Sequence, residues 1–231
     1  MLILGIESAS SQVGCAIGGH EGVLASAHTY QVSRHAENLA PQIDFVCRQA
    51  DIDLADLGVV AVDVGPGLFT GLRVGVATAL SIAYALGLPM VGVSSLDLLA
   101  FSARWTSRLI VAVLDARRGE VFTALFRQVP GGIQRIRDAN VCSLDELVAE
   151  LQVMDESMLL VGDGALRYSD SFESLTRVQM GEQGLAYPNA RALVQLAHAQ
   201  AMREEFVQPW DLEVVYLRKP DVEINWSIRG E

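Results

Sequence analysis

Apolar positions along this chain recur with strand and helix periods, and the order of these segments is repeated. The first half predicts strands over 2–6, 13–17, 23–30 and 59–64, and helices over 34–50 and 70–86 and after Ser94. The second half predicts strands over 109–114, 121–126, 133–137 and 158–161, and helices over 144–153 and 190–203. This duplication predicts two similar α/β lobes with mixed sheets, over residues 1–105 and 106–231.

Capping residues set the expected helix boundaries. A hydroxyl at the N-cap accepts a hydrogen bond from a backbone N–H of the first turn, and glycine often ends a helix. The first long helix carries an apolar stripe of Leu39, Ile43, Val46 and Cys47. The expected N-caps are Ser33, Thr70, Ser94 with Asp97 three residues on, and Ser143 with Glu146 in a full capping box; Gly87 with Pro89 ends the second long helix.

The segment Gly65-Pro-Gly-Leu-Phe-Thr-Gly-Leu-Arg-Val-Gly75 joins a buried strand to an apolar helix. One interpretation is a phosphate cradle at the helix start, although the spacing fits neither a P-loop nor a dinucleotide motif. A second is close packing, because Gly71, Gly75 and Ala79 follow one another at i+4 and give a smooth helix face. A third is a partner surface. We favour packing or partner burial.

The window 74–93 is free of charges and long enough to cross a bilayer. Gly87-Leu-Pro89 divides it into a helix and a strand, so we interpret it as core and expect no membrane role. Residues 1–6 lack the basic region and cleavage site of a signal peptide. The three cysteines are widely spaced and odd in number, which is typical of free thiols in a reducing compartment. We therefore expect a cytoplasmic protein.

The chain is acidic, with a formal net charge of -11 from 28 acidic and 17 basic residues. A surface of this sign repels phosphodiester backbones, so we do not expect it to bind tRNA or DNA by itself. Any nucleic-acid role then needs a partner to supply the positive surface.

Candidate chemistry is concentrated in two carboxylates. Glu7 and Asp63 stand at or near strand ends, where they can hold a metal-phosphate or act as a base, or simply accept hydrogen bonds from turn amides. We favour the turn interpretation. With Gly65 and Gly67 they are the only candidates for cofactor binding, and no catalytic residue is assigned.

Other catalytic signatures are missing from the sequence. No His-x-x-x-His or Cys-x-x-Cys pair is present, so we expect no metal site. Gly92-Val-Ser94-Ser-Leu96 fails the serine-hydrolase pattern at its last position. Asp115-Ala-Arg-Arg-Gly-Glu120 is a charged hairpin tip that is either a solvated turn or a docking element.

The glycine-rich segment resembles the Gly-Pro-Gly-Ser-Phe-Thr-Gly-Leu-Arg motif of the TsaB (YeaZ) family, whose members belong to the bacterial machinery for tRNA threonylcarbamoyladenosine. Four further segments resemble the family and together span nearly the whole chain: His35-Ala-Glu-Asn-Leu-Ala-Pro41, Pro89-Met-Val-Gly-Val-Ser-Ser-Leu96, Asp115-Ala-Arg-Arg-Gly-Glu-Val-Phe122 and Val215-Tyr-Leu-Arg218. The chain departs from the pattern at Glu7-Ser8, where the family usually has Asp-Thr, and at Leu68, where it has Ser.

The resemblance implies an actin/Hsp70/sugar-kinase-like (RNase H-like) fold and a non-catalytic scaffold that binds the catalytic homologue TsaD and, with it, the ATPase TsaE. TsaD carries a His-x-x-x-His metal site, whereas in this chain the residue four positions after His35 is Leu39. Such proteins meet tRNA only through the complex and pair with themselves in isolation. The expected interface consists of Leu39, Ile43 and Val46 from the first long helix and Leu72, Val76 and Leu80 from the second.

Two alternatives remain open from the sequence. One is an active kinase or ATPase that holds ATP or ADP with Mg at the lobe cleft or at a subunit interface. The other is a protease that acts on TsaD. Otherwise no cofactor is expected.

Overall fold

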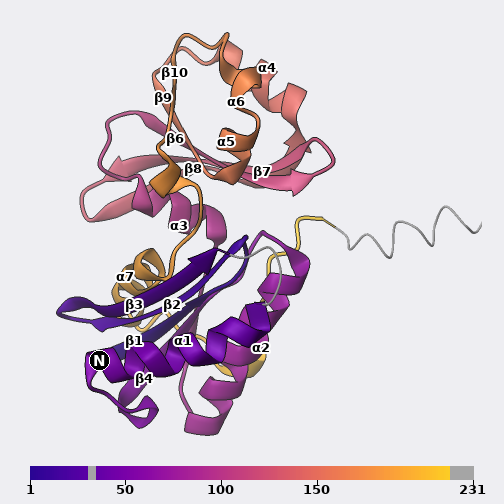
Figure 1. The fold of residues 1–231 in the computed structure, drawn as a ribbon. Helices are drawn as coiled ribbons and strands as arrows, with labels where there is room; N and C mark the ends of the chain where they lie inside the picture. The colour runs from indigo at the N-terminus through magenta and orange to yellow at the C-terminus, as the bar shows by residue number, and fades with distance from the viewer. Residues whose placement is uncertain (31–34, 219–231) are drawn as a thin grey trace, which may run out of the picture.

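The structure is a computed structural model that describes residues 1–30 and 35–218, and it consists of two stacked α/β lobes (Figure 1). Each lobe is built on one five-stranded mixed sheet, and the strand orders are β3-β2-β1-β4-β5 and β10-β9-β6-β7-β8. In both sheets the first three strands of the lobe are antiparallel and the last two are parallel to the first. The two sheets therefore share one topology, which confirms the predicted duplication.

The first lobe contains β1 (Leu2–Glu7), β2 (Gln12–Gly19), β3 (Gly22–Tyr30), α1 (His35–Ala50), β4 (Leu57–Asp63), α2 (Phe69–Leu86), β5 (Met90–Val93) and α3 (Ser95–Ser102). The central strands are apolar without interruption because both faces of the sheet are covered. On β1, Leu4 and Ile6 point to the core under α1 and α2, whereas Ile3 points to the core under α7.

The second lobe contains β6 (Leu109–Arg117), β7 (Glu120–Val129), β8 (Gly132–Ser143), α4 (Leu144–Val153), β9 (Met158–Val161), α5 (Asp163–Arg167), α6 (Ser169–Phe172), β10 (Val178–Met180) and α7 (Ala190–Ala201). Over residues 109–114, strand β6 is again apolar on both faces. Ile110 and Ala112 join the core that includes α3, and Leu109 and Val111 join the core under α4, α5 and α6.

Helices α3 and α7 lie between the two sheets, and each of them packs on the sheet of the other lobe (Figure 1). Leu96 and Leu99 of α3 belong to the core of the second sheet, whereas Leu193 and Val194 of α7 belong to the core of the first. All strands of the first sheet precede residue 105 in the sequence, and all strands of the second sheet follow it. Helix α3 precedes residue 105 but packs on the second sheet, and α7 follows it but packs on the first. The lobes are joined by this exchange as well as by the chain connection.

The helix ends agree with the capping predictions at most positions. The Ser94 side chain accepts a hydrogen bond from the Leu96 N–H, and Ser143 with Glu146 forms the predicted capping box. Gly87 ends α2 in the left-handed conformation with φ of 67°. The prediction for Thr70 was wrong: α2 begins at Phe69, and Leu68 is its N-cap without a side-chain hydrogen bond. Ser33 lies outside the described residues.

Cys15, Cys47 and Cys142 are free thiols, as predicted; Cys15 and Cys47 are buried and Cys142 is half-buried. The sequence did not predict α5, α6 and β10, which have five, four and three residues. Segments this short carry too few periodic positions to be recognised.

Candidate functional site

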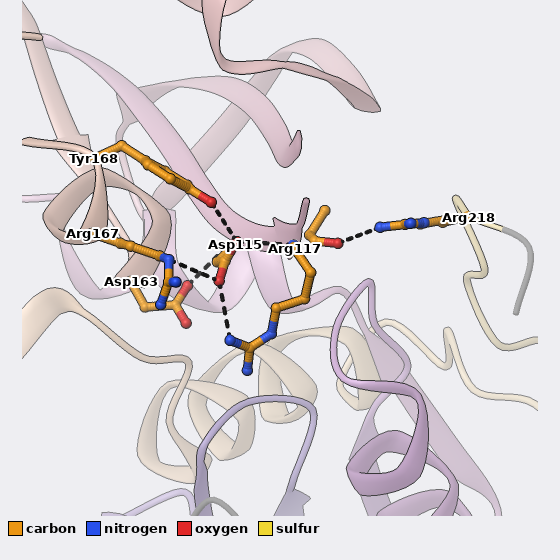
Figure 2. A network of polar contacts seen from close by, with 7 residues as sticks. Asp115, Arg117, Asp163, Arg167, Tyr168 and Arg218 are labelled. Carbon is orange, nitrogen blue, oxygen red and sulfur yellow. Dashed lines mark hydrogen bonds and ion pairs between the residues drawn. The ribbon is translucent and has the colours of Figure 1, made fainter. Parts of the chain in front are cut away.

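The hairpin between β6 and β7 is the centre of a polar network in the cleft between the lobes (Figure 2). The Asp115 side chain is 5% exposed and forms an ion pair with Arg117 at 3.4 Å and with Arg167 at 3.5 Å. It also accepts hydrogen bonds from the Arg117 N–H at 2.9 Å and from the Tyr168 hydroxyl at 3.1 Å. One buried carboxylate thus orients two half-exposed guanidinium groups.

The tip of this hairpin is backbone-strained. Arg117 and Arg118 have φ of 67° and 56°, and Gly119 follows with 77°. A left-handed conformation costs roughly 1–2 kcal/mol for a residue other than glycine. The hydrogen bond from the Arg117 N–H to Asp115 offsets part of that cost and fixes the tip.

Asp163, at the start of α5, places a second carboxylate beside the first. Its Oδ1 accepts a hydrogen bond from the Asp115 N–H at 3.0 Å. Burial raises the pKa of Asp163 to about 6, and the Asp115 charge adds to the rise, although the N–H groups of Asp115 and Gly164 oppose it. The network therefore contains a carboxyl group that titrates closer to neutrality than an ordinary aspartate.

The tail after α7 crosses the cleft and contacts both lobes. The Val215 N–H donates to the Val64 carbonyl in the first lobe at 2.8 Å. Arg218 donates to the Ala116 carbonyl in the second lobe at 2.6 Å (Figure 2). It also forms an ion pair with Glu120 at 3.3 Å. The two contacts tie the lobes together at the hairpin.

Two cavities flank the network and share Asp115 and Arg117. The smaller one, of about 320 Å³, is mostly apolar and lies between the glycine-rich loop and the tail. The larger one, of about 820 Å³, lies between the β1–β2 turn and α5 and includes Arg167, Asp163 and Tyr187. Both offer arginines to an anionic group, with aromatic side chains at their edges.

The glycines of the loop allow close packing. A Cβ at Gly67 would lie 2.2 Å from the Ala9 carbonyl oxygen, and the Leu68 N–H donates to that same oxygen at 2.7 Å. A Cβ at Gly75 would lie 2.3 Å from the Ser8 hydroxyl. Gly65 has φ of 94° and is buried, whereas Gly67 borders the smaller cavity. Packing against the β1–β2 turn accounts for Gly67 and Gly75.

Glu7 and Asp63 lie at the ends of the paired strands β1 and β4 and are buried, with exposures of 0% and 2%. Glu7 accepts from the Ala9 N–H at 2.9 Å. Asp63 accepts from the Gly65 N–H at 2.8 Å and from the Ser95 hydroxyl at 2.6 Å. These are the turn contacts that we favoured from the sequence, and neither residue lines the two cavities.

Both carboxyl groups hold their protons more strongly than usual. Burial raises the pKa of Glu7 well above its ordinary value, with a further rise from Asp63, and burial raises the pKa of Asp63 to about 7. One oxygen of each, Glu7 Oε2 and Asp63 Oδ2, has no hydrogen-bond partner among the described residues. Near neutral pH the pair therefore keeps at least part of its protons.

This leads to a prediction for pH. The pKa of an aspartate in the unfolded chain is about 3.9, and that of Asp63 in the folded protein is about 7. At pH values between these two, the folded state binds more protons than the unfolded state, so the free energy of unfolding falls as pH rises. Asp63→Asn carries no such proton. Between about pH 4.5 and pH 7.5, the free energy of unfolding of the wild type should fall relative to the variant, by at most about 4 kcal/mol.

Urea denaturation at a series of pH values measures this difference. Asp138→Asn is the control, because the Asp138 side chain is 97% exposed. If the curves of wild type and Asp63→Asn stay parallel over this pH range, Asp63 does not titrate there.

The predicted partner interface needs a correction. Leu39, Ile43, Val46, Leu72 and Val76 are 0–8% exposed and form part of the core between the first sheet and helices α1 and α2. Leu80 is half-buried against the same core. A side chain already covered by its own sheet has no area left for a partner. The prediction was therefore wrong for the five buried residues.

The outward surfaces of these helices carry other residues. Phe45 of α1 is 46% exposed and Tyr84 of α2 is 57% exposed. The Tyr84 ring lies 6.3 Å from that of Trp210, which is itself 66% exposed.

Among the described residues, α2 is also the one helix with the length and hydropathy of a membrane span, but a third of it is buried by the first lobe.

None of the network residues was predicted as a site residue. The sequence indicated the hairpin 115–120 as a turn or docking element and Arg218 as part of a family motif, but Asp163, Arg167 and Tyr168 were missed altogether. The signal available was Gly162-Asp-Gly164 directly after a strand, which indicates a close turn at a strand end. Within the described residues, no group of three or more His, Cys, Asp and Glu side chains is placed to hold a metal ion.

The sequence was compared with known families and proteins. Residues 23–226 match the family described as "TsaD: tRNA N6-adenosine threonylcarbamoyltransferase". The chain is 30% identical to the tRNA threonylcarbamoyladenosine biosynthesis protein TsaB of Bacillus subtilis (strain 168), over 98% of each chain.

The fold was compared with solved structures. YeaZ from Pseudomonas aeruginosa superposes with a TM-score of 0.79 at 22% identity, over 94% of this chain and 99% of that one. Component A of the (R)-2-hydroxyglutaryl-CoA dehydratase of Acidaminococcus fermentans superposes with a TM-score of 0.53 at 12% identity, over 87% and 99%. These similarities confirm the two-lobed actin/Hsp70/sugar-kinase-like fold.

Proposed function

The chain belongs to the TsaB family of tRNA threonylcarbamoyladenosine biosynthesis proteins, and on that premise we propose that it is the non-catalytic subunit that supports threonylcarbamoyl transfer. In this role it binds a TsaD-type catalytic subunit and, together with it, a TsaE-type ATPase. The catalytic subunit transfers the group to the adenosine beside the anticodon, in tRNAs that read ANN codons. The protein acts in the cytoplasm, without a membrane.

The observation that carries this proposal is the exposed surface of α2. The helix has eighteen residues, and its only charged side chain is Arg73. Six of its residues are buried in the first lobe, which leaves the rest at least partly accessible. A helix this poor in charge is typically covered on all sides, so the outer surface fits a protein partner.

The shape of that surface suits another helix. Ala77, Ser81 and Ala85 follow Arg73 at intervals of four residues, and all are exposed. Small side chains in an i+4 row allow a partner helix to approach closely, with ridges packed into grooves. Tyr84 adds an exposed aromatic ring, a residue type that contributes strongly to interfaces. In isolation, the same surface is available to a second copy of the chain.

A reconstituted reaction tests the proposal. Threonylcarbamoyl transfer to tRNA is measured with the catalytic subunit, the ATPase and the activated donor, with this chain present or omitted. We expect activity to require the chain and to persist in Glu7→Gln and Asp63→Asn, because a scaffold needs no buried carboxylate for chemistry. Activity that is independent of the chain would contradict the scaffold role, and activity that needs those carboxylates would favour an enzyme.

A nucleotide in the cleft is the second candidate, and the cavity of about 820 Å³ favours it. Arg117 and Arg167 offer guanidinium groups there, and the rings of Tyr30 and Tyr187 lie 5.6 Å apart at its edge. An ATPase or kinase of this fold would bind ATP or ADP with Mg in the isolated chain, and calorimetry measures that binding directly. The protease alternative expects TsaD to be cleaved on incubation with this chain, so intact TsaD would exclude it.

A further inference from the structure

A third cavity, of about 570 Å³, lies beside the lobe cleft and is bordered by β3, α3, the 183–189 segment and the start of α7. It shares Gln12, Gln183 and Tyr187 with the large cavity of the cleft. It includes neither Asp115 nor Asp163. We call it the α3–α7 groove, and it is separate from the network of Figure 2.

The charge of the α3–α7 groove is opposite to that of the chain. Its ionisable side chains, apart from Cys15 and Tyr187, are His28, Arg104 and Arg191, and no carboxylate lines it, although the chain has 28 acidic and 17 basic residues. Among the described residues, Arg104 and Arg191 have no carboxylate within ion-pair distance. The positive charge of these two guanidinium groups is therefore not neutralised by a described carboxylate and can attract an anion to this site.

Arg104 is held in a fixed position. It donates to the Phe101 carbonyl at 2.6 Å, and its guanidinium carbon lies 3.8 Å from the Phe101 ring centroid and 4.7 Å from that of Trp105. The Trp105 side chain is 82% exposed. A fixed arginine next to an exposed indole offers a charge for a phosphate and a flat surface for a base.

Amide side chains complete the lining. Gln12, Gln183, Asn189 and Gln195 all border the groove. Asn189 donates to the Ser102 hydroxyl at 3.0 Å, which fixes the wall between α3 and α7. Amide groups have both donors and acceptors and can form hydrogen bonds with the edges of unpaired bases.

From this combination we propose that the α3–α7 groove binds a single-stranded segment of RNA, with phosphates at Arg104 and Arg191 and a base stacked on Trp105, which does not itself line the groove but contacts Arg104. The inference rests on the proposed function and adds to it a direct contact between this chain and RNA. The sequence predicted no such contact because net charge averages over the whole surface, whereas binding depends on the charges close to the phosphate.

The test measures binding of a short fluorescein-labelled single-stranded RNA to the isolated chain by anisotropy, at about 50 mM salt and above. Arg104→Glu with Arg191→Glu should weaken binding at least about tenfold. It should also reduce the slope of log affinity against log salt by about 1.4, at about 0.7 for each phosphate contact of a single strand. Trp105→Ala should weaken binding by about tenfold through lost stacking.

The matched control is Arg48→Glu with Arg203→Glu, which makes the same change in charge at exposed positions away from the groove. An equal loss in the control would show a non-specific effect of net charge and overturn the proposal. So would failure of the wild type to bind the RNA at about 50 mM salt, or displacement of the RNA by AMP at equal concentration of nucleotide. Far-UV circular dichroism checks that each variant is folded.

These outcomes are independent of the scaffold role, because no other subunit is present. A chain that supports threonylcarbamoyl transfer but does not bind this RNA would overturn the groove assignment and leave the proposed function standing. A chain that binds the RNA through Arg104 and Arg191 but is dispensable for transfer would support the groove assignment and contradict the proposed function.

Discussion

Replacing Ala77 by arginine is expected to abolish binding of the catalytic subunit, and with it threonylcarbamoyl transfer, while the chain stays folded. Ala77 is exposed near the middle of α2, where it is the first residue of the small-residue row Ala77, Ser81 and Ala85. A guanidinium there prevents close helix approach, and in the complex it would be buried without a partner. A buried unpaired charge costs about 3–5 kcal/mol, which weakens binding by a factor of about 100 or more.

The control for this variant is Ala199→Arg, because Ala199 is also exposed and also lies on a helix, α7. Calorimetry or analytical ultracentrifugation measures the affinity for the catalytic subunit, and urea denaturation checks that both variants are as stable as the wild type. We expect the control to bind normally. Undiminished binding by Ala77→Arg would move the interface away from α2.

Replacing Gly162 by alanine is expected to lower the free energy of unfolding by at least about 3 kcal/mol. Gly162 has φ of 111°, in a region that is almost restricted to glycine. A Cβ there would also lie 2.0 Å from the Val113 carbonyl oxygen, which belongs to β6 and cannot move without disturbing the sheet. The same shift would displace Asp163 from the Asp115 N–H.

Two glycine variants separate the causes. Gly131→Ala tests conformation alone, since φ is 86° and nothing lies within 4 Å of the added carbon; we expect a loss of about 1 kcal/mol. Gly184→Ala is the control for both causes, because φ at Gly184 is not positive and nothing lies within 4 Å of the added carbon. It should leave the free energy of unfolding nearly unchanged. Urea denaturation measures all three. Equal effects at Gly162 and Gly131 would show that the contact with Val113 relaxes without cost.

Most of the secondary structure was predictable because it depends on local patterns. The β9 strand has the predicted bounds, Met158–Val161, since a run of four apolar residues between polar ones fits a buried strand. The capping box at Ser143 and Glu146 was visible as two residues at a fixed spacing. Thr70 had equally suitable chemistry, but the loop brings Leu68 to the N-cap instead. Local chemistry alone does not choose among neighbouring caps.

The interface prediction was wrong for a physical reason. An apolar stripe on a helix predicts burial, but it does not tell whether the stripe packs on the sheet of its own lobe or on a partner protein. Leu39 and Val76 belong to the first case. Which residues of α2 stay exposed became clear only from the helix orientation, which brings Ala77 and Tyr84 to the surface.

The network at Asp115 was only half visible in the sequence. The charged hairpin tip was recognised, but Asp163 and Tyr168 lie 48 and 53 residues further along the chain. Contacts at this separation depend on how β6, β9 and α5 pack, and no local spacing encodes that packing. The same holds for Arg218, which is 102 residues from the carbonyl that it contacts.

The sequence by itself determined most of the strands, most helix ends, the duplication and the family, because periodicity, caps and motifs are local properties of the chain. Only the tertiary structure decided that α3 packs on the sheet of the second lobe and α7 on the sheet of the first. The same is true of the tail that contacts both lobes, and of the groove that is lined by no carboxylate in an acidic chain. Each of these features forms where segments distant in sequence pack against one another. The free energy that favours such packing depends on several segments together, so no single segment of the sequence predicts it.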